Sequence, residues 1–338
     1  MNAPGTRQAD TVAVRSLLAD GSLVTVTASR RPRGGRAELK CSAPGAPALA
    51  ARMGQVARLA RHTEARYDSR DQVVIGMDRA PGSNERDWEL AVVLADRMVR
   101  GLLPARPGLV ANGWSDAWER GRIAGHDTRA APAGALLGGA GNLHHIGALS
   151  GQPDVAASVS GARAWFPLHS GGIHDALGWV EVSVYPLEEG GGGDEDAVAA
   201  PGLDSARLAA LRQVLAGARH FDGQAVDKWR TTVRFGVDAF HGNSWELALV
   251  LADRIARGRE FIPRGRIIAS ACSTAWHAGL VEAVAGLGPK CALIEREAQA
   301  GDRVLLPRAW EADLPPGFAE ALRRKGASLA CIDRIGII

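Results

Sequence analysis

The sequence is poor in cysteine, in aromatic residues and in lysine. Cysteine occurs only at Cys41, Cys272, Cys291 and Cys331, and aromatic residues make up 5% of the 338 residues. The cysteines lack the short C-x-x-C or Cys/His spacings of a zinc site, so we expect neither a metal nor another cofactor. Scattered cysteines in a chain of this size are typical of reduced thiols, which favours a cytoplasmic location.

Long apolar runs and blocks of like charge are also missing. No run approaches the roughly 20 apolar residues that a membrane-spanning helix needs, and residues 1–10 are too polar for a signal peptide. The formal net charge is only +3, and the basic residues are spread along the chain. Because nucleic-acid binding usually shows as a concentrated basic patch, we expect contact with neither nucleic acid nor membrane.

An internal repeat organises the chain and indicates a duplication. The segment 88–101, WELAVVLADRMVRG, recurs with few changes as 245–258, WELALVLADRIARG. The flanking segments recur as well, with strands at 72–78 and 232–238, helices at 49–62 and 208–220, and β-prone segments at 108–111 and 266–269.

Strands mixed with helices in each copy predict an α/β fold, in the form of an α+β two-layer sandwich. We expect a first domain over 10–170 and a second over 171–338, each ending in an apolar strand closed by proline, at 164–167 and 304–307. Duplicated domains of one chain commonly pair as an intramolecular pseudo-dimer. The sequence leaves the formation of a homo-oligomer open.

The two copies differ just before the repeated helix, which we expect at 246–257. The second copy has His241-Gly-Asn-Ser244, whereas Asp87 stands in the place of Ser244 in the first copy. Asparagine and serine are common helix N-caps, which is one explanation of Gly242-Asn243-Ser244. A serine there is also a candidate nucleophile, because the amides and dipole at a helix N-terminus can stabilise an oxyanion.

A serine hydroxyl needs a neighbouring base, and Lys290 is the candidate. Arginine cannot be deprotonated in a protein, whereas burial can lower the pKa of a lysine toward neutrality. Lys290 lies in an apolar segment, 280–294, so we predict that it takes the proton of Ser244. The sequence has 40 lysine and arginine residues, of which the only lysines are Lys40, Lys228, Lys290 and Lys325.

The order of these elements resembles the protease domain of the Lon family, a fold shared with a domain of a small-subunit ribosomal protein. That domain has Gly-x-Ser opening a buried helix, then a Val/Ile-Gly-Gly-Leu-x-x-Lys segment and a Val-Leu-x-Pro strand. This chain has Gly242-Asn-Ser244, then Val284-Ala-Gly-Leu-Gly-Pro-Lys290, then Val304-Leu-Leu-Pro307. It departs from the family at Trp245-Glu246, where Ala-Gly is common, and at Cys272-Ser-Thr274, where the family has Thr-Gly-Glu.

The resemblance implies a serine endopeptidase with a Ser244–Lys290 dyad. Gly242, Asn243, Ser273 and Thr274 would support the dyad, and the substrate would be a peptide or an unfolded protein. The Lon family couples this domain to an AAA+ ATPase. The chain has no Gly-x-x-x-x-Gly-Lys-Ser/Thr phosphate loop, so the ATPase would come from another polypeptide.

The first copy and two other functions remain to be weighed. Asp87 and His145 occupy the serine and lysine positions of the first copy, which we predict to be non-catalytic. The alternative function for the whole chain is an inactive Lon-like scaffold or binding module in an ATPase-associated complex. A small-molecule kinase of the related GHMP fold ranks last, because Gly242-Asn-Ser244 does not supply its glycine-rich phosphate loop.

Overall fold

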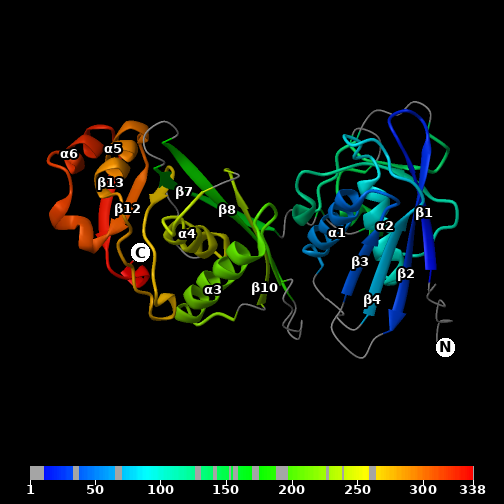
Figure 1. Cartoon of the computed structure of the whole chain (residues 1–338), viewed down its shortest axis with the longest axis horizontal. Helices are drawn as coiled ribbons and strands as arrows, with labels where there is room; N and C mark the ends of the chain where they lie inside the picture. The colour runs from blue at the N-terminus through cyan, green and yellow to red at the C-terminus, as the bar shows by residue number, and fades with distance from the viewer. Residues whose placement is uncertain are drawn as a thin grey trace. The chain divides into compact units, whose positions relative to one another are not determined.

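The computed structural model describes residues 11–32, 38–64, 71–125, 131–139, 143–151, 154, 159–169, 175–187, 197–225, 228–237, 240–258 and 264–337. The chain forms two compact units, and the main division falls between Val159 and Ser160 (Figure 1). The second unit therefore begins earlier than the expected boundary at 171. Among the helices of the described residues, none is long and apolar enough to cross a membrane.

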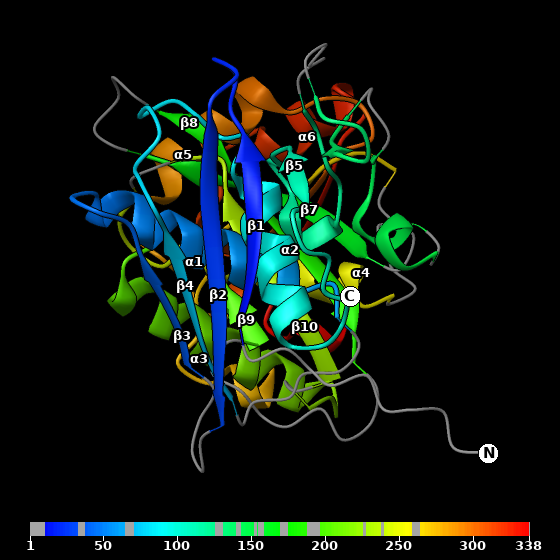
Figure 2. The ribbon, with the colours of Figure 1, turned by 90° about the vertical axis from the view of Figure 1, so that its right-hand side faces the viewer.

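In its described residues, the first unit contains one six-stranded mixed sheet and two α-helices. Its elements are β1 (Thr11–Leu17), β2 (Leu23–Pro32), β3 (Glu38–Ser42), α1 (Pro47–Arg61), β4 (Asp71–Met77), α2 (Glu89–Val99), β5 (Val110–Asn112), η1 (Trp118–Arg120), β6 (Leu136–Leu137) and η2 (Ile146–Ser150). The strand order is β3-β4-β2-β1-β5-β6, and Figure 2 shows β3, β4, β2 and β1 side by side. Helix α2 packs on this sheet, and α1 packs against α2 and β3.

The second unit contains a seven-stranded mixed sheet and four α-helices among its described residues. Its elements are β7 (Ser160–Leu168), β8 (Ala176–Pro186), β9 (Val198–Ala199), α3 (Ser205–Phe221), β10 (Trp229–Phe235), α4 (Glu246–Ala256), β11 (Ile267–Ala269), η6 (Trp276–Ala278), α5 (Leu287–Glu297), β12 (Arg303–Pro307), η7 (Arg308–Asp313), α6 (Phe318–Arg324), β13 (Ser328–Ile332) and η8 (Ile335–Ile337). The strand order is β13-β12-β11-β7-β8-β10-β9.

The two units share one topology, so the sequence repeat is also a structural repeat. Strands β1 and β2 form an antiparallel hairpin, as β7 and β8 do. Strand β3 pairs in parallel with β4, as β9 does with β10. Strand β5 pairs in parallel with β1, as β11 does with β7. The expected helix at 246–257 is observed as α4, and Gly258 follows it in a left-handed conformation with φ +82°.

The expectation that 164–167 ends the first copy is wrong. These residues lie in β7, where Trp165 pairs with Trp179 of β8 and with Ile268 of β11. By its place in the topology, β7 corresponds to β1. The segment resembles 304–307 only because both are apolar and end in proline.

Helices cover both faces of the sheet around β11 in the second unit. Ile267 and Ala269 belong to the core that contains α4, whereas Ile268 belongs to the core that contains α5 and α6. Successive side chains of a strand point to opposite faces, so this short strand serves two cores. The mixed α/β sandwich is confirmed, and α5 and α6 add a further layer to it.

A buried carboxylate fixes the far end of each repeated helix. Asp253 of α4 accepts hydrogen bonds from Arg219 of α3 and from Arg257. The side chains of Arg219 and Asp253 are both 0% exposed. A charge buried this deeply requires a partner of opposite sign, so these pairs lock α4 against α3. The first unit repeats the arrangement with Asp96, Arg61 and Arg100.

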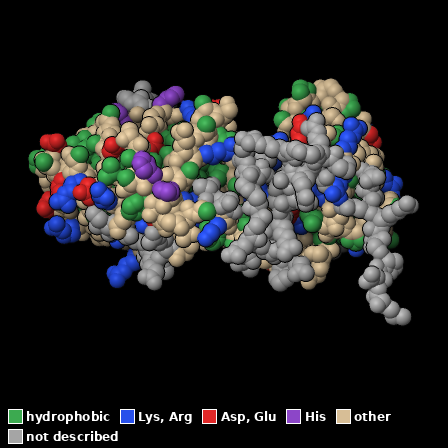
Figure 3. All heavy atoms as spheres, turned by 90° about the horizontal axis from the view of Figure 1, so that it is seen from below, with side chains coloured by type: hydrophobic (Ala, Val, Ile, Leu, Met, Phe, Trp, Pro, Cys, Tyr) green, Lys and Arg blue, Asp and Glu red, His purple; other side chains and the backbone are tan. Residues whose placement is uncertain are grey.

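Charged side chains on the surface are of both signs. On the face shown in Figure 3, lysine and arginine side chains lie beside aspartate and glutamate side chains at the left of the view. This agrees with the small formal net charge of +3.

The substitution Arg219→Met should lower the free energy of unfolding of the second unit by about 3 kcal/mol, because Asp253 keeps its buried charge and loses one of two arginine partners. The control Arg308→Met breaks an exposed pair with Glu311 and should cost at most about 1 kcal/mol. Urea unfolding followed by tryptophan fluorescence measures both variants. Equal losses in the two variants would contradict the prediction.

Candidate active site

The loop before α4 holds Ser244 at the start of a buried helix. Gly242 adopts φ +74°, a left-handed conformation that favours glycine, and its carbonyl accepts a hydrogen bond from the indole of Trp245. The carbonyl of Asn243 accepts a hydrogen bond from the amide of Glu246. Ser244 is only 6% exposed. Its hydroxyl is therefore carried by a turn with defined backbone bonds.

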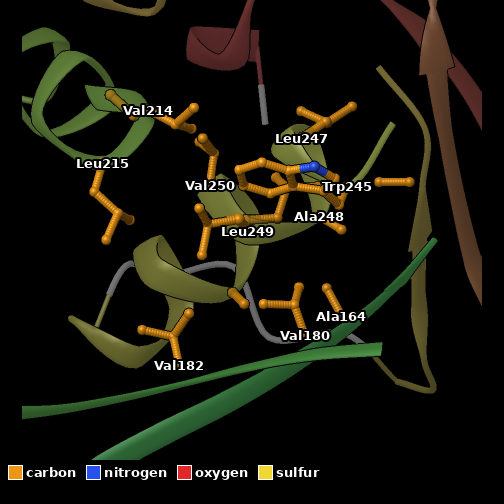
Figure 4. Close-up of a cluster of buried hydrophobic side chains, with 14 of the residues drawn as sticks. Ala164, Val180, Val182, Val214, Leu215, Trp245, Leu247, Ala248, Leu249 and Val250 are labelled. Carbon is orange, nitrogen blue, oxygen red and sulfur yellow. The ribbon is translucent and has the colours of Figure 1, made fainter. Parts of the chain in front are cut away.

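The side chain of Trp245 belongs to the core. Figure 4 shows its indole within the same cluster as Val250 and Leu249 of α4. Its ring lies edge-on to those of Phe235 and Phe240, at centroid distances of 5.7 and 6.1 Å. Trp245 therefore has a packing role in the core. The bulky residue next to Ser244 is directed into the interior of the fold.

Lys290 lies in the first turn of α5, where its amide donates a hydrogen bond to the carbonyl of Gly286. The residue is 7% exposed. Burial disfavours the charged ammonium and lowers the pKa of Lys290 to about 8, although the nearby Cys272 acts in the opposite direction. An amine with this pKa is partly neutral near pH 7, so it can accept a proton.

Two other lysines keep the roles of charged groups. The Lys325 ammonium donates hydrogen bonds to the carbonyls of Glu295 and Arg296 at the end of α5. Lys40 pairs with Glu38 in the first unit, and its side chain is 56% exposed. Lys290 differs from both because it is buried and lines a cavity.

Ser244 and Lys290 line one cavity of about 810 Å³, which we call the Ser244 cavity. Gly242 and Asn243 line it too. Residues from the turn before α4 and from the first turn of α5 thus line the same cavity. The other described lining residues are Leu168, His169, Ala176, Val237, Phe240, His241, Cys272, Val284, Ala285 and Gly286.

The two other expected supporting residues, Ser273 and Thr274, form hydrogen bonds within their own loop. The Ser273 hydroxyl accepts a bond from the amide of Ala275 at 2.9 Å. Thr274 donates to Glu282 through both its amide and its hydroxyl. From this loop it is Cys272 that lines the cavity. Burial raises the pKa of the Cys272 thiol, which favours its neutral form.

Glu246 stands where the Lon family commonly has a small residue, and it has a structural role. Its Oε2 atom accepts hydrogen bonds from the indole of Trp276 at 2.8 Å and from the amide of Ser273 at 3.2 Å. These bonds tie the start of α4 to the loop that contributes Cys272. In the first unit, Glu89 bonds Trp118 and Ser115 in the same way.

The first unit carries no equivalent pair of reactive groups in its described residues. Asp87, at the place of Ser244, is 0% exposed. The preceding Arg86 pairs with Glu89 and Asp116, and so occupies this helix start with ion pairs. His145 accepts a hydrogen bond from the amide of Ala148 at the start of η2. It follows β6, whereas Lys290 precedes β12, the strand that corresponds to β6, so His145 does not occupy the place of Lys290 in the fold. Among the described residues between β5 and β6, no counterpart of α5 is present.

Two imidazoles of the cavity, those of His169 and His241, were missed by sequence analysis. His169 lies at the expected boundary between the domains, where the sequence predicts no functional site. The apolar pattern of 160–168 is the signal that could have indicated this histidine. As the first strand of the second copy, this segment places residue 169 at the end of a hairpin.

Among the described residues, no group of three or more His, Cys, Asp or Glu side chains is placed to hold a metal ion. A scan against protein-family models and a search of curated proteins found no match to this chain. The function must therefore be inferred from the chemistry of the Ser244 cavity.

Proposed function

We propose that the second unit is a Lon-like serine peptidase in which Ser244 is the nucleophile and Lys290 the general base. The observation that supports this most directly is that a buried serine and a buried lysine line one cavity. The lowered pKa of Lys290, about 8, suits proton transfer from a hydroxyl at neutral pH. The apolar walls formed by residues such as Leu168 and Phe240 suit a peptide substrate.

The reaction proceeds as an acyl transfer. The amine of Lys290 takes the proton of the Ser244 hydroxyl as its oxygen attacks the peptide carbonyl carbon. The proton then passes to the leaving nitrogen as the C–N bond breaks, and water hydrolyses the resulting ester. The carbonyl of Asn243 and that of Ala271 bind the amides of Glu246 and Leu247, so we assign the oxyanion to the amides that precede these, at Ser244 and Trp245.

The peptidase would work on peptides or unfolded segments, in the cytoplasm. The sequence has no phosphate loop with which to unfold a substrate. Degradation of folded proteins would therefore need an AAA+ ATPase as a separate partner. The cytoplasm fits the four cysteines, all of which are free thiols.

A fluorophosphonate probe should label Ser244 in the wild-type protein. The variants Ser244→Ala and Lys290→Met should lose labelling, the latter by at least about 100-fold, because general-base catalysis contributes on that order. Lys40→Met is the matched control, since Lys40 lies on the surface of the first unit. Mass spectrometry of the intact protein measures the labelling, and thermal unfolding checks that each variant is folded. Wild-type labelling in Lys290→Met would refute the dyad.

The labelling rate should rise as the pH is raised through about 8 and level off above it, because only the neutral amine of Lys290 can accept a proton. An exposed lysine would place this midpoint near 10.4 instead. The variant Lys290→Arg should show no such rise, since arginine keeps its proton. Rates are measured from pH 6 to pH 10 with Ser244→Ala as the background. A rate that falls over this range would be the contrary result.

A second candidate function is a non-catalytic scaffold. The first unit favours it, because Asp87 replaces the serine and Arg86 fills that helix start with ion pairs. One unit is thus already without the chemistry while it keeps the fold. If no probe labels Ser244, even with a partner ATPase present, the scaffold becomes the better proposal.

A further inference from the structure

The end of the β7–β8 hairpin carries a histidine–aspartate pair beside the Ser244 cavity. The register pairs Leu168 with Ala176, so His169 and Asp175 are the next residues outward on the two strands. Nδ1 of His169 lies 2.7 Å from Oδ2 of Asp175. His169 also lines the cavity that contains Ser244 and Lys290. His169 is therefore part of the cavity wall, and Asp175 supports it from outside the set of lining residues.

The Asp175 carboxylate determines which nitrogen of His169 faces a ligand. An ionised carboxylate only accepts hydrogen bonds, so the Nδ1 atom carries the proton of this bond. Nε2 is then the nitrogen left for a bound group, and it donates a hydrogen bond when the ring is protonated. The side chain of Asp175 is 13% exposed and that of His169 is 32% exposed, so Asp175 is the more buried of the two and the ring of His169 remains accessible.

A contact with α5 fixes the hairpin end relative to the lysine. The guanidinium of Arg296 donates a hydrogen bond to the backbone carbonyl of Asp175 at 3.1 Å. Arg296 and Lys290 lie on the same helix. The hairpin end that carries His169 is thereby bonded directly to the helix that carries Lys290.

The cavity wall formed by the described residues carries basic side chains, and the Asp175 carboxylate bonds His169 without being among the lining residues. The basic side chains of this wall are His169, His241 and Lys290, and no aspartate or glutamate is among its described lining residues. The nearby carboxylates of Glu246 and Glu282 are already bound to the loop 273–276. The remaining described wall is largely apolar. A ligand that complements this wall has an apolar part and an anionic group.

We propose that His169, oriented by Asp175, binds an acidic side chain of the peptide substrate, and that the cavity thereby selects peptides in which an acidic residue lies near an apolar one. This substrate class rests on the proposed peptidase function. His169 acts as a specificity residue, because it binds the substrate beside the bond that Ser244 attacks. A charge-assisted hydrogen bond of this kind is worth about 10-fold in affinity or more.

The test uses the full chain with the substitution Ser244→Ala, so that binding is measured without cleavage. The probes are fluorescein-labelled peptides of leucine, alanine and glycine that carry one glutamate, moved in turn through the central positions, and the matching glutamine peptides. Fluorescence anisotropy gives the dissociation constants. At one position or more, the glutamate peptide should bind about 10-fold more tightly than its glutamine counterpart.

That preference should disappear when His169→Gln or Asp175→Asn is added to Ser244→Ala. The control is His277→Gln, which changes an exposed histidine of the same unit, and it should keep the preference. Equal binding of glutamate and glutamine peptides at every position overturns the proposal, as does a preference that survives His169→Gln. Fluorophosphonate labelling of the wild-type chain reports on the peptidase function separately, so failure of one proposal is distinguishable from failure of the other.

Discussion

The position of the candidate nucleophile depends on a buried helix that is held by a carboxylate at each end. Glu246, at the start of α4, binds the loop after β11, and Asp253, near its end, binds Arg219 of α3. Nearly all side chains between them are buried and apolar. Buried carboxylates that lose their partners are costly, so these two fix α4 along its axis. The position of the turn that contains Ser244 therefore depends on the buried carboxylates of Glu246 and Asp253.

The surroundings of Lys290 differ from those of the buried arginines in the second unit. The buried guanidinium groups of Arg219 and Arg257 are each stabilised by a carboxylate of the core. Lys290 is buried in the wall of a cavity whose described lining includes no carboxylate, so burial acts on it with little compensation. A guanidinium in that place would remain charged. The rarity of lysine in the sequence thus pointed to the residue whose proton can be removed.

The sequence could predict those elements in which the repeat and the apolar periodicity agree, such as α3, α4 and β10. It failed at β7, since an apolar run closed by proline does not show whether the strand ends one copy of the repeat or begins the next. The error at β7 also hid His169, whose contacts with Asp175 and the cavity arise from the register of β7 with β8. Ser244 and Lys290 could be proposed from the sequence because each has a local signature, a helix start and a lysine in an apolar segment.

The two units keep the same bonds at the start of the repeated helix and differ in the loop in front of it. Both keep a glutamate that bonds a tryptophan and a backbone amide at the helix start, Glu89 in one and Glu246 in the other. The loops in front of these helices differ, because Arg86 braces the first with ion pairs while Asn243 in the second lines a cavity. Stability therefore comes from bonds behind the helix start. The residues in front of the helix start, such as Arg86 and Asn243, are not part of these bonds and differ between the two units.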